Sequence, residues 1–289
     1  MSATASTDGT AAPLIQPAPH LGRWFGVALV GLVLAWILFQ VLTNPGFEWQ
    51  TVFRYILHRD VLAGVATTLQ LTVLVMVIGT LIGIVIALMR LSRDPVLGFC
   101  AHGFVWFFRG TPLLVQLVFW YNLAALFPTL SLGIPFGGPK FYEISATAAI
   151  SSFAAALLGL ALNEAAYMAE IVRAGLLSVD PGQREASKAL GHTPLQTFRV
   201  VVLPQAMKAI VPPTGNQVIG MLKYTSLASV VALHELMHAV ENIYSRTFET
   251  IPLLIVASLW YLAMVSLLSV AQHFIERYYA RGWDGYSPT

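Results

Sequence analysis

Two histidines and a glutamate late in the sequence have the spacing of a metal site. His234, Glu235 and His238 fit the pattern H-E-x-x-H, in which two histidines one helical turn apart bind zinc and the glutamate acts as a base. The longer form of that pattern fails, because Glu241 and Tyr244 stand where it requires glycine and histidine. A membrane-embedded zinc protease is therefore an alternative hypothesis, and the favoured interpretation has no metal ligands in this chain.

A second group of polar residues interrupts otherwise apolar sequence. Glu164 follows the uncharged stretch 144–163, and a charged side chain inside a membrane helix costs about 2.5–3.5 kcal/mol on insertion scales. One interpretation is that Glu164, with Asn163 and Tyr167 nearby, recognises an ammonium or cationic group in a solute pathway. The other interpretation is a structural ion pair between Glu164 and Lys223. Lys223 likewise has two interpretations: it binds a substrate carboxylate, or it pairs with Glu164.

These residues belong to a very apolar chain. Its 289 residues are 57% hydrophobic and 10% charged, and the mean hydropathy is +0.71. A soluble domain is roughly 45–50% apolar and about 25% charged, so the composition excludes a soluble enzyme and indicates a multi-pass membrane protein. The net charge of +2 gives no sign of a nucleic-acid partner, and the single cysteine excludes an internal disulfide framework.

The elements that must position the polar residues are membrane helices of about 20 residues. An all-α integral membrane protein with six transmembrane helices is expected. The predicted spans are Trp24–Leu42, Val61–Met89, Gly110–Pro139, Ile144–Asn163 continuing toward Leu177, Gln205–Leu233 and Thr250–Ile275.

The distribution of Lys and Arg predicts the direction of these spans. With the N-terminus inside, ten basic residues fall in inner segments and four in outer segments, which agrees with the excess of positive charge in cytoplasmic loops. Both termini are therefore expected in the cytoplasm. The Ala/Thr/Pro-rich residues 1–22 are expected to form a flexible cytoplasmic tail, followed by an additional N-terminal transmembrane helix at 23–43.

Two places carry helix-breaking residues. Pro212-Pro213 with Gly215 predicts either a discontinuous helix beside the pathway or a packing kink. Arg109 stands just before Pro112, and we expect it to reach the inner membrane edge, with a role in gating as the alternative. Glu170 and Arg173 are three residues apart and are expected to pair on one helix.

The longest hydrophilic stretch, 178–204, begins with helix signals. Asp180 is a good N-cap, Pro181 fits the first helical position, and Gly191 suits the left-handed residue that ends a helix. Thr193-Pro194-Leu195-Gln196 repeats the start signal at once. We therefore expect two short, separately capped helices that meet near Gly191. The first has a small, smooth face suited to a cleft on another protein, although a stabilised connector is the plainer alternative.

This loop resembles the EAA loop of ABC-importer permeases. Glu185-Ala186-Ser187, Gly191 and Val201-Val202-Leu203-Pro204 follow its order and spacing, with Ser187 in place of alanine and Val201 in place of isoleucine. Three further segments resemble the polar amino-acid branch, which includes histidine, glutamine, glutamate and arginine permeases. They are Phe108–Gln116, Ala166–Ile171 and Leu222–Leu227.

The resemblance covers about residues 61–280 and implies a type I importer with a five-helix core, here preceded by one added span. It implies a bacterial inner-membrane complex of two permease subunits, identical or different, two cytoplasmic ATPases that hold ATP and Mg, and an extracytoplasmic solute-binding protein. The sequence has no G-x-x-x-x-G-K-[ST] phosphate loop. We therefore expect a transport subunit for polar or charged amino acids that is not an enzyme and binds no cofactor itself. A secondary transporter is a further alternative.

The expected functional residues fall into three sets. Those for ATPase coupling are Asp180, Gly182, Glu185, Ala186, Gly191, Leu203 and Pro204. Those for the substrate pathway are Asn163, Glu164, Tyr167, Lys223, Thr225 and Ser226. Those with a gating or structural role are Arg109, Pro112, Pro212 and Pro213.

Overall fold

The computed structural model describes residues 21–133, 138–145 and 150–280. Contacts between residues divide the chain into a unit that ends at Glu48 and a unit that begins at Trp49. The first unit holds α1 (Leu21–Thr43), which covers the whole of the added span expected at 23–43, and a short 3-10 helix at Pro45–Phe47. The expected flexible tail, 1–22, lies outside the described residues except for its last two.

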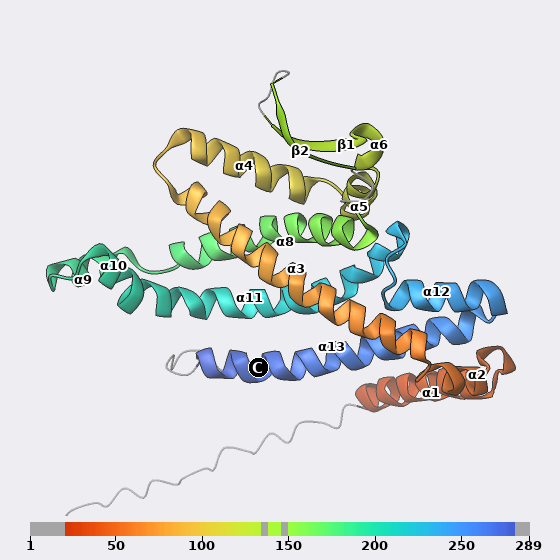
Figure 1. The fold of residues 1–289 in the computed structure, drawn as a ribbon. Helices are drawn as coiled ribbons and strands as arrows, with labels where there is room; N and C mark the ends of the chain where they lie inside the picture. The colour runs from red at the N-terminus through yellow and green to blue at the C-terminus, as the bar shows by residue number, and fades with distance from the viewer. Residues whose placement is uncertain (1–20, 134–137, 146–149, 281–289) are drawn as a thin grey trace, which may run out of the picture. The chain divides into compact units, whose positions relative to one another are not determined.

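The second unit is built mainly from helices (Figure 1). Its first helices are α2 (Trp49–Tyr55), α3 (Arg59–Leu91), α4 (Pro95–Gly110), α5 (Leu113–Tyr121) and α6 (Leu123–Leu126). Its later helices are α8 (Ser152–Leu177), α9 (Pro181–Ala189), α10 (Pro194–Gln196), α11 (Leu203–Tyr224), α12 (Leu236–Thr247) and α13 (Thr250–Ala280). A π-helix, Thr197–Val202, leads into α11, and a 3-10 helix, Thr225–Val231, follows it.

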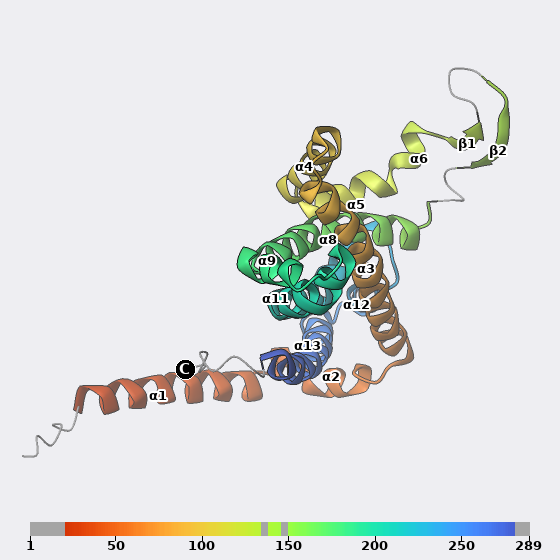
Figure 2. The ribbon, with the colours of Figure 1, turned by 90° about the vertical axis from the view of Figure 1, so that its left-hand side faces the viewer.

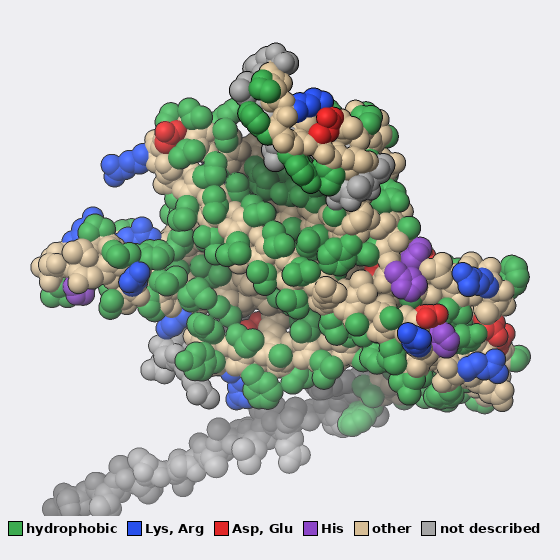
Figure 3. All heavy atoms as spheres, viewed as in Figure 1, with side chains coloured by type: hydrophobic (Ala, Val, Ile, Leu, Met, Phe, Trp, Pro, Cys, Tyr) green, Lys and Arg blue, Asp and Glu red, His purple; other side chains and the backbone are tan. Residues whose placement is uncertain are grey.

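Several of these helices have the length and composition of membrane spans. Among the described residues, four qualify alone, namely α1, α3, α8 and α13, and α4 with α5 makes a fifth if that bent pair crosses as one. Figure 3 shows a broad band of hydrophobic side chains between two ends of the second unit, at α9–α10 and at α12, where charged and histidine side chains gather. The prediction of a helical membrane protein is confirmed at this level.

The predicted third span, Gly110–Pro139, is wrong. α4 and α5 meet at an angle of 101°, and α5 is followed by a four-residue helix and then a strand. Thr111 has extended backbone, with φ −107° and ψ 143°, because a residue that precedes proline disfavours helical backbone. The break therefore comes from Pro112, inside a stretch whose lack of charge suggested one continuous helix.

A β-hairpin also departs from the all-α prediction. β1 (Thr129–Gly133) pairs antiparallel with β2 (Lys140–Ser145), and the register shifts between Leu132 and Gly133. Lys140 Nζ and Glu143 Oε1 are 3.0 Å apart on the second strand. Figures 1 and 2 both show the hairpin extending away from the helices.

The centre of the second unit is the contact between α3 and α8. Gly79 and Gly83, one helical turn apart on α3, lie against α8. A Cβ atom on Gly79 would stand 2.9 Å from Glu164 Cβ, and one on Gly83 would stand 2.7 Å from Met168 Cβ. The small-xxx-small spacing lets the two backbones approach closely, as it does between membrane helices generally.

The prolines of α11 do not interrupt it. Pro212 and Pro213 lie inside one continuous helix, which gives way to 3-10 geometry only at Thr225. The amide of Gln272 on α13 donates to the Pro212 carbonyl at 3.4 Å, and the Thr214 hydroxyl donates to the carbonyl of Ile210 at 2.8 Å. Side-chain donors thus bond carbonyls around the proline pair, and the discontinuous helix considered from the sequence is not formed there.

Candidate coupling loop and solute pathway

The first helix of the hydrophilic loop has the predicted ends. Asp180 is the N-cap of α9, and its carboxylate accepts from the backbone N–H of Gly182 at 2.7 Å. Gly191 ends the turn with φ +81°, in the left-handed region that favours glycine. Glu185 and Ala186 are exposed, and Leu190 is 78% exposed. The face expected to meet another protein is therefore open.

The second helix of the loop differs from the prediction. Thr193 and Gln196 form the expected capping box, but α10 has no end of its own. It passes through the π-helix directly into α11, where Leu203 is the first residue and Pro204 the second. A π-helix is rare and often marks a functional position. The loop is therefore one short helix followed by the start of a long one.

A buried hydroxyl joins the two parts of the loop. Ser187 on α9 is 3% exposed, and its Oγ lies 3.0 Å from His192 Nδ1 and 2.9 Å from Thr197 Oγ1. Ser187 stands where the EAA pattern has alanine, and the partners of its hydroxyl are not evident from the sequence. It connects α9 with the first turn of the π-helix.

We expect Ser187→Ala to loosen that connection. A buried hydrogen bond contributes about 0.5–1.5 kcal/mol, so the substrate-stimulated ATPase rate of the assembled complex should fall about fivefold while complex yield stays normal. Ser178→Ala is the matched control, because Ser178 Oγ donates only to the nearby carbonyl of Gly175. Equal stimulated rates in the two variants would show that Ser187 has no part in coupling.

The break between α4 and α5 is held by polar side chains. The Asn163 amide on α8 donates to the carbonyl of Phe108 at 2.8 Å and lies 3.3 Å from Gln116 Oε1. The Gln116 amide donates to the same carbonyl at 2.9 Å and to Thr111 Oγ1 at 2.6 Å. Asn163, expected in the substrate pathway, is thus buried here and bonds the bend beside Pro112.

Glu164 is also buried, at 2% exposed, against Gly79 of α3. Its Oε1 has no hydrogen-bond partner among the described residues. No ion pair joins it to Lys223 in this part of the chain, so the structural pair considered from the sequence is not formed. Lys223 is instead exposed at the end of α11.

The other expected pathway residues separate into exposed and buried ones. Tyr167 is exposed, and the Arg109 guanidinium carbon lies 5.1 Å from the centre of its ring, within the range of a cation–π contact. Ser226 donates to the Lys223 carbonyl at 2.7 Å. Thr225 is fully buried and donates to the carbonyl of Leu222 at 2.7 Å.

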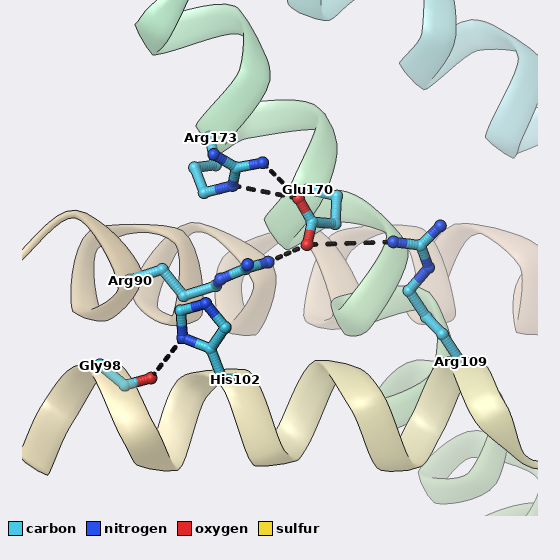
Figure 4. Close-up of polar contacts among 6 residues, drawn as sticks. All are labelled: Arg90, Gly98, His102, Arg109, Glu170 and Arg173. Atoms are coloured by element: carbon cyan, nitrogen blue, oxygen red, sulfur yellow. Dashed lines mark hydrogen bonds and ion pairs between the residues drawn. The ribbon is translucent and has the colours of Figure 1, made fainter.

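Three arginines from three helices converge on the carboxylate of Glu170 (Figure 4). Arg90 of α3 pairs with Glu170 of α8, Arg173 pairs with it at 3.0 Å, and Arg109 of α4 lies 3.9 Å from it. The predicted pairing of Glu170 with Arg173 is confirmed. The contacts of Glu170 with Arg90 and Arg109 were not predicted, because those residues lie far away in sequence.

The H-E-x-x-H segment does not form the helical arrangement of a zinc site. α12 begins at Leu236, so His234 and Glu235 precede the helix that carries His238. Glu235 is the N-cap of α12 and is fully buried. Its carboxylate accepts hydrogen bonds from the N–H groups of Met237 and His238 and from the Tyr261 hydroxyl. Burial raises the pKa of Glu235 to about 7, and this effect is larger than the lowering of the pKa by the three hydrogen bonds.

A cavity of about 610 Å³ lies between α3, α8, α11 and α13. Its walls are apolar apart from a few residues such as Thr214, Gln272 and Glu276. None of the six expected pathway residues lines it in the described part of the chain. An apolar cavity offers little to a polar solute, so this space is not the site that the sequence suggested.

Comparisons with known proteins agree with the geometry of the loop and helices. The protein family described as "Binding-protein-dependent transport system inner membrane component" matches residues 79–281. An arginine transport system permease protein of Corynebacterium glutamicum is 42% identical over 269 residues, covering 92% of this chain and 83% of that protein. An octopine transport system permease protein of Rhizobium meliloti is 38% identical, covering 76% of this chain and 84% of that protein.

Two solved structures are also similar. One is an amino acid ABC transporter crystallised with histidines, with a TM-score of 0.63, 37% identity and coverage of 75% of this chain and 93% of that one. The other is the MetNI methionine ABC transporter in an inward-facing form, with a TM-score of 0.62, 22% identity and coverage of 78% and 98%. At that identity, the second likeness concerns the fold alone.

Proposed function

This chain belongs to the family of binding-protein-dependent transport system inner membrane components, and from that premise we propose that it moves polar or charged amino acids inward by alternating access. It is a multi-pass permease subunit of an ABC importer for amino acids in a bacterial inner membrane, and it is not itself an enzyme. The zinc-protease and secondary-transporter alternatives are therefore set aside. The observation that carries the mechanism is the exposed, capped α9 helix.

In the proposed topology, the chain crosses the membrane six times with both termini in the cytoplasm. The spans are α1, α3, the bent pair α4–α5, α8, α11 and α13. This direction puts α9 and α10 on the cytoplasmic side, where α9 docks in a groove of a partner ATPase. Asp180, Gly182, Glu185, Ala186 and Gly191 shape that docking helix, and Leu203 and Pro204 begin the span that receives its motion.

The working complex contains two permease subunits, this chain with either a second copy or a different permease. Two cytoplasmic ATPases bind ATP and Mg, and an extracytoplasmic protein delivers the solute. ATP binding draws the two α9 helices together and turns the pore outward. Arg109 and Pro112, at the bend between α4 and α5, act in gating, and Pro212 and Pro213 shape α11 beside the pathway.

Arginine is the first solute to test, because a 42%-identical relative is an arginine transport system permease. The complex should be purified with its partners, its bound solute identified by mass spectrometry, and uptake measured in vesicles. We expect labelled arginine to accumulate only when ATP is present on the side of the membrane where the ATPase subunits lie. We also expect unlabelled polar amino acids to compete with arginine for uptake better than leucine does. ATP-independent uptake, or equal competition by leucine, would contradict the proposed function.

Glu164 is proposed to face the solute in another state of the transport cycle. A buried carboxylate oxygen without a partner is unusual and has a cost, and exposure to a cationic group during the cycle would relieve it. Asn163, Tyr167, Lys223, Thr225 and Ser226 are proposed to line the same pathway. Of these, Tyr167 and Lys223 already reach the surface.

We expect Glu164→Gln to leave complex yield normal, since it keeps the packing against Gly79, and to lower arginine uptake by about tenfold or more, because it removes the charge. Uptake of a neutral amino acid should fall less. Adding Lys223→Met should restore nothing, because the two side chains form no ion pair. Reduced yield in Glu164→Gln that the second change rescues would return Glu164 to a structural role.

A further inference from the structure

The cluster formed by Arg90, Arg109, Arg173 and Glu170 carries more positive than negative charge (Figure 4). Three guanidinium groups share one carboxylate, which leaves a formal excess of two positive charges. Among the described residues, no second carboxylate forms an ion pair with these arginines. Like charges held this close repel one another unless an anion offsets them.

The donors of the cluster are far from saturated. Glu170 Oε1 meets Arg90 and Arg109, and Oε2 meets Arg173 through two nitrogens. Buried Nε of Arg90 has no acceptor among the described residues. A guanidinium carries five N–H donors and binds phosphate well with two of them at once. The arrangement therefore has both charge and donors left for an anion.

The cluster is closed on one side and open on the other. The Arg90 side chain is 12% exposed, whereas those of Arg173 and Arg109 are 31% and 43% exposed. Arg109, the most exposed of the three, belongs to α4, whose surface carries exposed large apolar side chains. These are Val96, Phe99, Trp106 and Phe107.

We propose that this cluster binds the phosphate of an anionic phospholipid of the inner leaflet. The assignment uses the proposed topology, in which α3 ends on the cytoplasmic side, since Arg90 is the residue before the last of that helix. The inner leaflet carries anionic lipids that attract basic residues. A lipid also fits the exposed apolar face of α4, which can pack against acyl chains, whereas a free anion gives that face no partner.

The test uses the complete complex in vesicles of phosphatidylcholine with increasing phosphatidylglycerol. Native mass spectrometry counts the phosphatidylglycerol molecules retained by the permease after extraction. Arg173→Gln is expected to lower the apparent affinity about fivefold, since a basic residue near the surface contributes about 1 kcal/mol to binding anionic lipid. Arg109→Gln, whose ion pair is the longest of the three, should act in the same direction if Arg173→Gln folds poorly.

Two controls separate an anion site from a structural ion cluster. Arg93→Gln removes the same charge from the exposed turn between α3 and α4 and should leave lipid retention unchanged. Glu170→Gln should raise lipid retention, because it removes the anion that competes with the phosphate. A purely structural cluster predicts the opposite, since Glu170→Gln breaks the same ion pairs as Arg173→Gln.

Other outcomes would overturn the proposal. Equal retention of phosphatidylglycerol by Arg173→Gln and Arg93→Gln would show that the cluster binds no lipid. Displacement of phosphatidylglycerol by inorganic phosphate alone would show that the cluster binds soluble anions. A raised KM for the amino acid in the arginine variants, with unchanged lipid retention, would show that the cluster binds the transported solute. ATPase stimulation by the loaded binding protein, measured in the same vesicles, tests the proposed transport function separately from the lipid count.

Discussion

Glu185→Lys should abolish substrate-stimulated ATP hydrolysis while the permease still folds and assembles in the membrane. Glu185 is exposed on α9, so the substitution disturbs no core packing, but it reverses the charge on the helix proposed to dock in the ATPase. Loss of one partner in an interfacial charge pair typically costs about 2–5 kcal/mol, which corresponds to about thirtyfold or more in affinity. ATPase rates with and without loaded binding protein provide the measurement.

Gly191→Trp should have the same effect by another route. The φ angle of +81° at Gly191 strains any residue that has a Cβ, even though the space around it is open. The end of α9 would have to change its path, and with it the position of the docking face. Gly98→Trp on α4 is the matched control, since a Cβ there meets nothing within 4 Å and no positive φ is involved.

Arg93→Glu controls for Glu185→Lys, because it makes a charge change of equal size, and opposite sign, on the exposed turn between α3 and α4, outside the loop. Full stimulation in Glu185→Lys, or equal loss in Arg93→Glu, would contradict a docking role for α9. Normal arginine uptake by Gly191→Trp would remove the proposed importance of the turn. Membrane yield must be measured for each variant so that a folding defect is recognised.

Gly83→Val is expected to destroy the fold of the second unit rather than its coupling. A Cβ at this position would lie 2.7 Å from Met168 Cβ and 2.9 Å from the Ala165 carbonyl oxygen, and atoms fixed to a helix backbone cannot move aside cheaply. Overpacking of a core typically costs about 1–3 kcal/mol and sometimes more. We therefore expect little or no assembled complex, measured as monodisperse protein after extraction and as the midpoint of thermal unfolding.

Gly103→Val is the control for that experiment. Gly103 also lies inside a helix, α4, but a Cβ there meets nothing within 4 Å. The two substitutions therefore change intrinsic helix propensity in the same way and differ only in what the new side chain contacts. Equal yields from the two variants would show that the close approach of α3 and α8 is not required.

The parts of the molecule that local sequence signals specify were predicted best. The Asp180 cap and the Gly191 terminus of α9 follow from short-range backbone chemistry, and the apolar runs of α1, α3 and α13 follow from the length of a membrane span. The Gly79–Gly83 spacing is a further local signal, one that predicts close packing of α3 against another helix. Thr111-Pro112 carried the signal for the bend, but the absence of charge around it outweighed the backbone preference.

Contacts between distant residues could not be predicted in this way. Nothing near Ser187 in sequence shows that its hydroxyl meets Thr197, and nothing near Arg90 shows that it meets Glu170. Glu164 and Lys223 were plausible partners by charge, but charge says nothing of the distance between them. The hairpin is not predicted, because its strands are short and β1 lies inside the uncharged stretch Gly110–Pro139, which has the composition of a membrane span.

The hydrogen bonds at the bend between α4 and α5 have a consequence for how the permease moves. Asn163 of α8 and Gln116 of α5 both bond the carbonyl of Phe108, in the last turn of α4, so hydrogen bonds within the chain join the three helices at one point. In the proposed alternating access, we expect these bonds to make α4, α5 and α8 move together. A change of backbone geometry during the cycle is then expected outside this group of helices, and the π-helix between α10 and α11 is a candidate place for it, since such helices often mark functional positions.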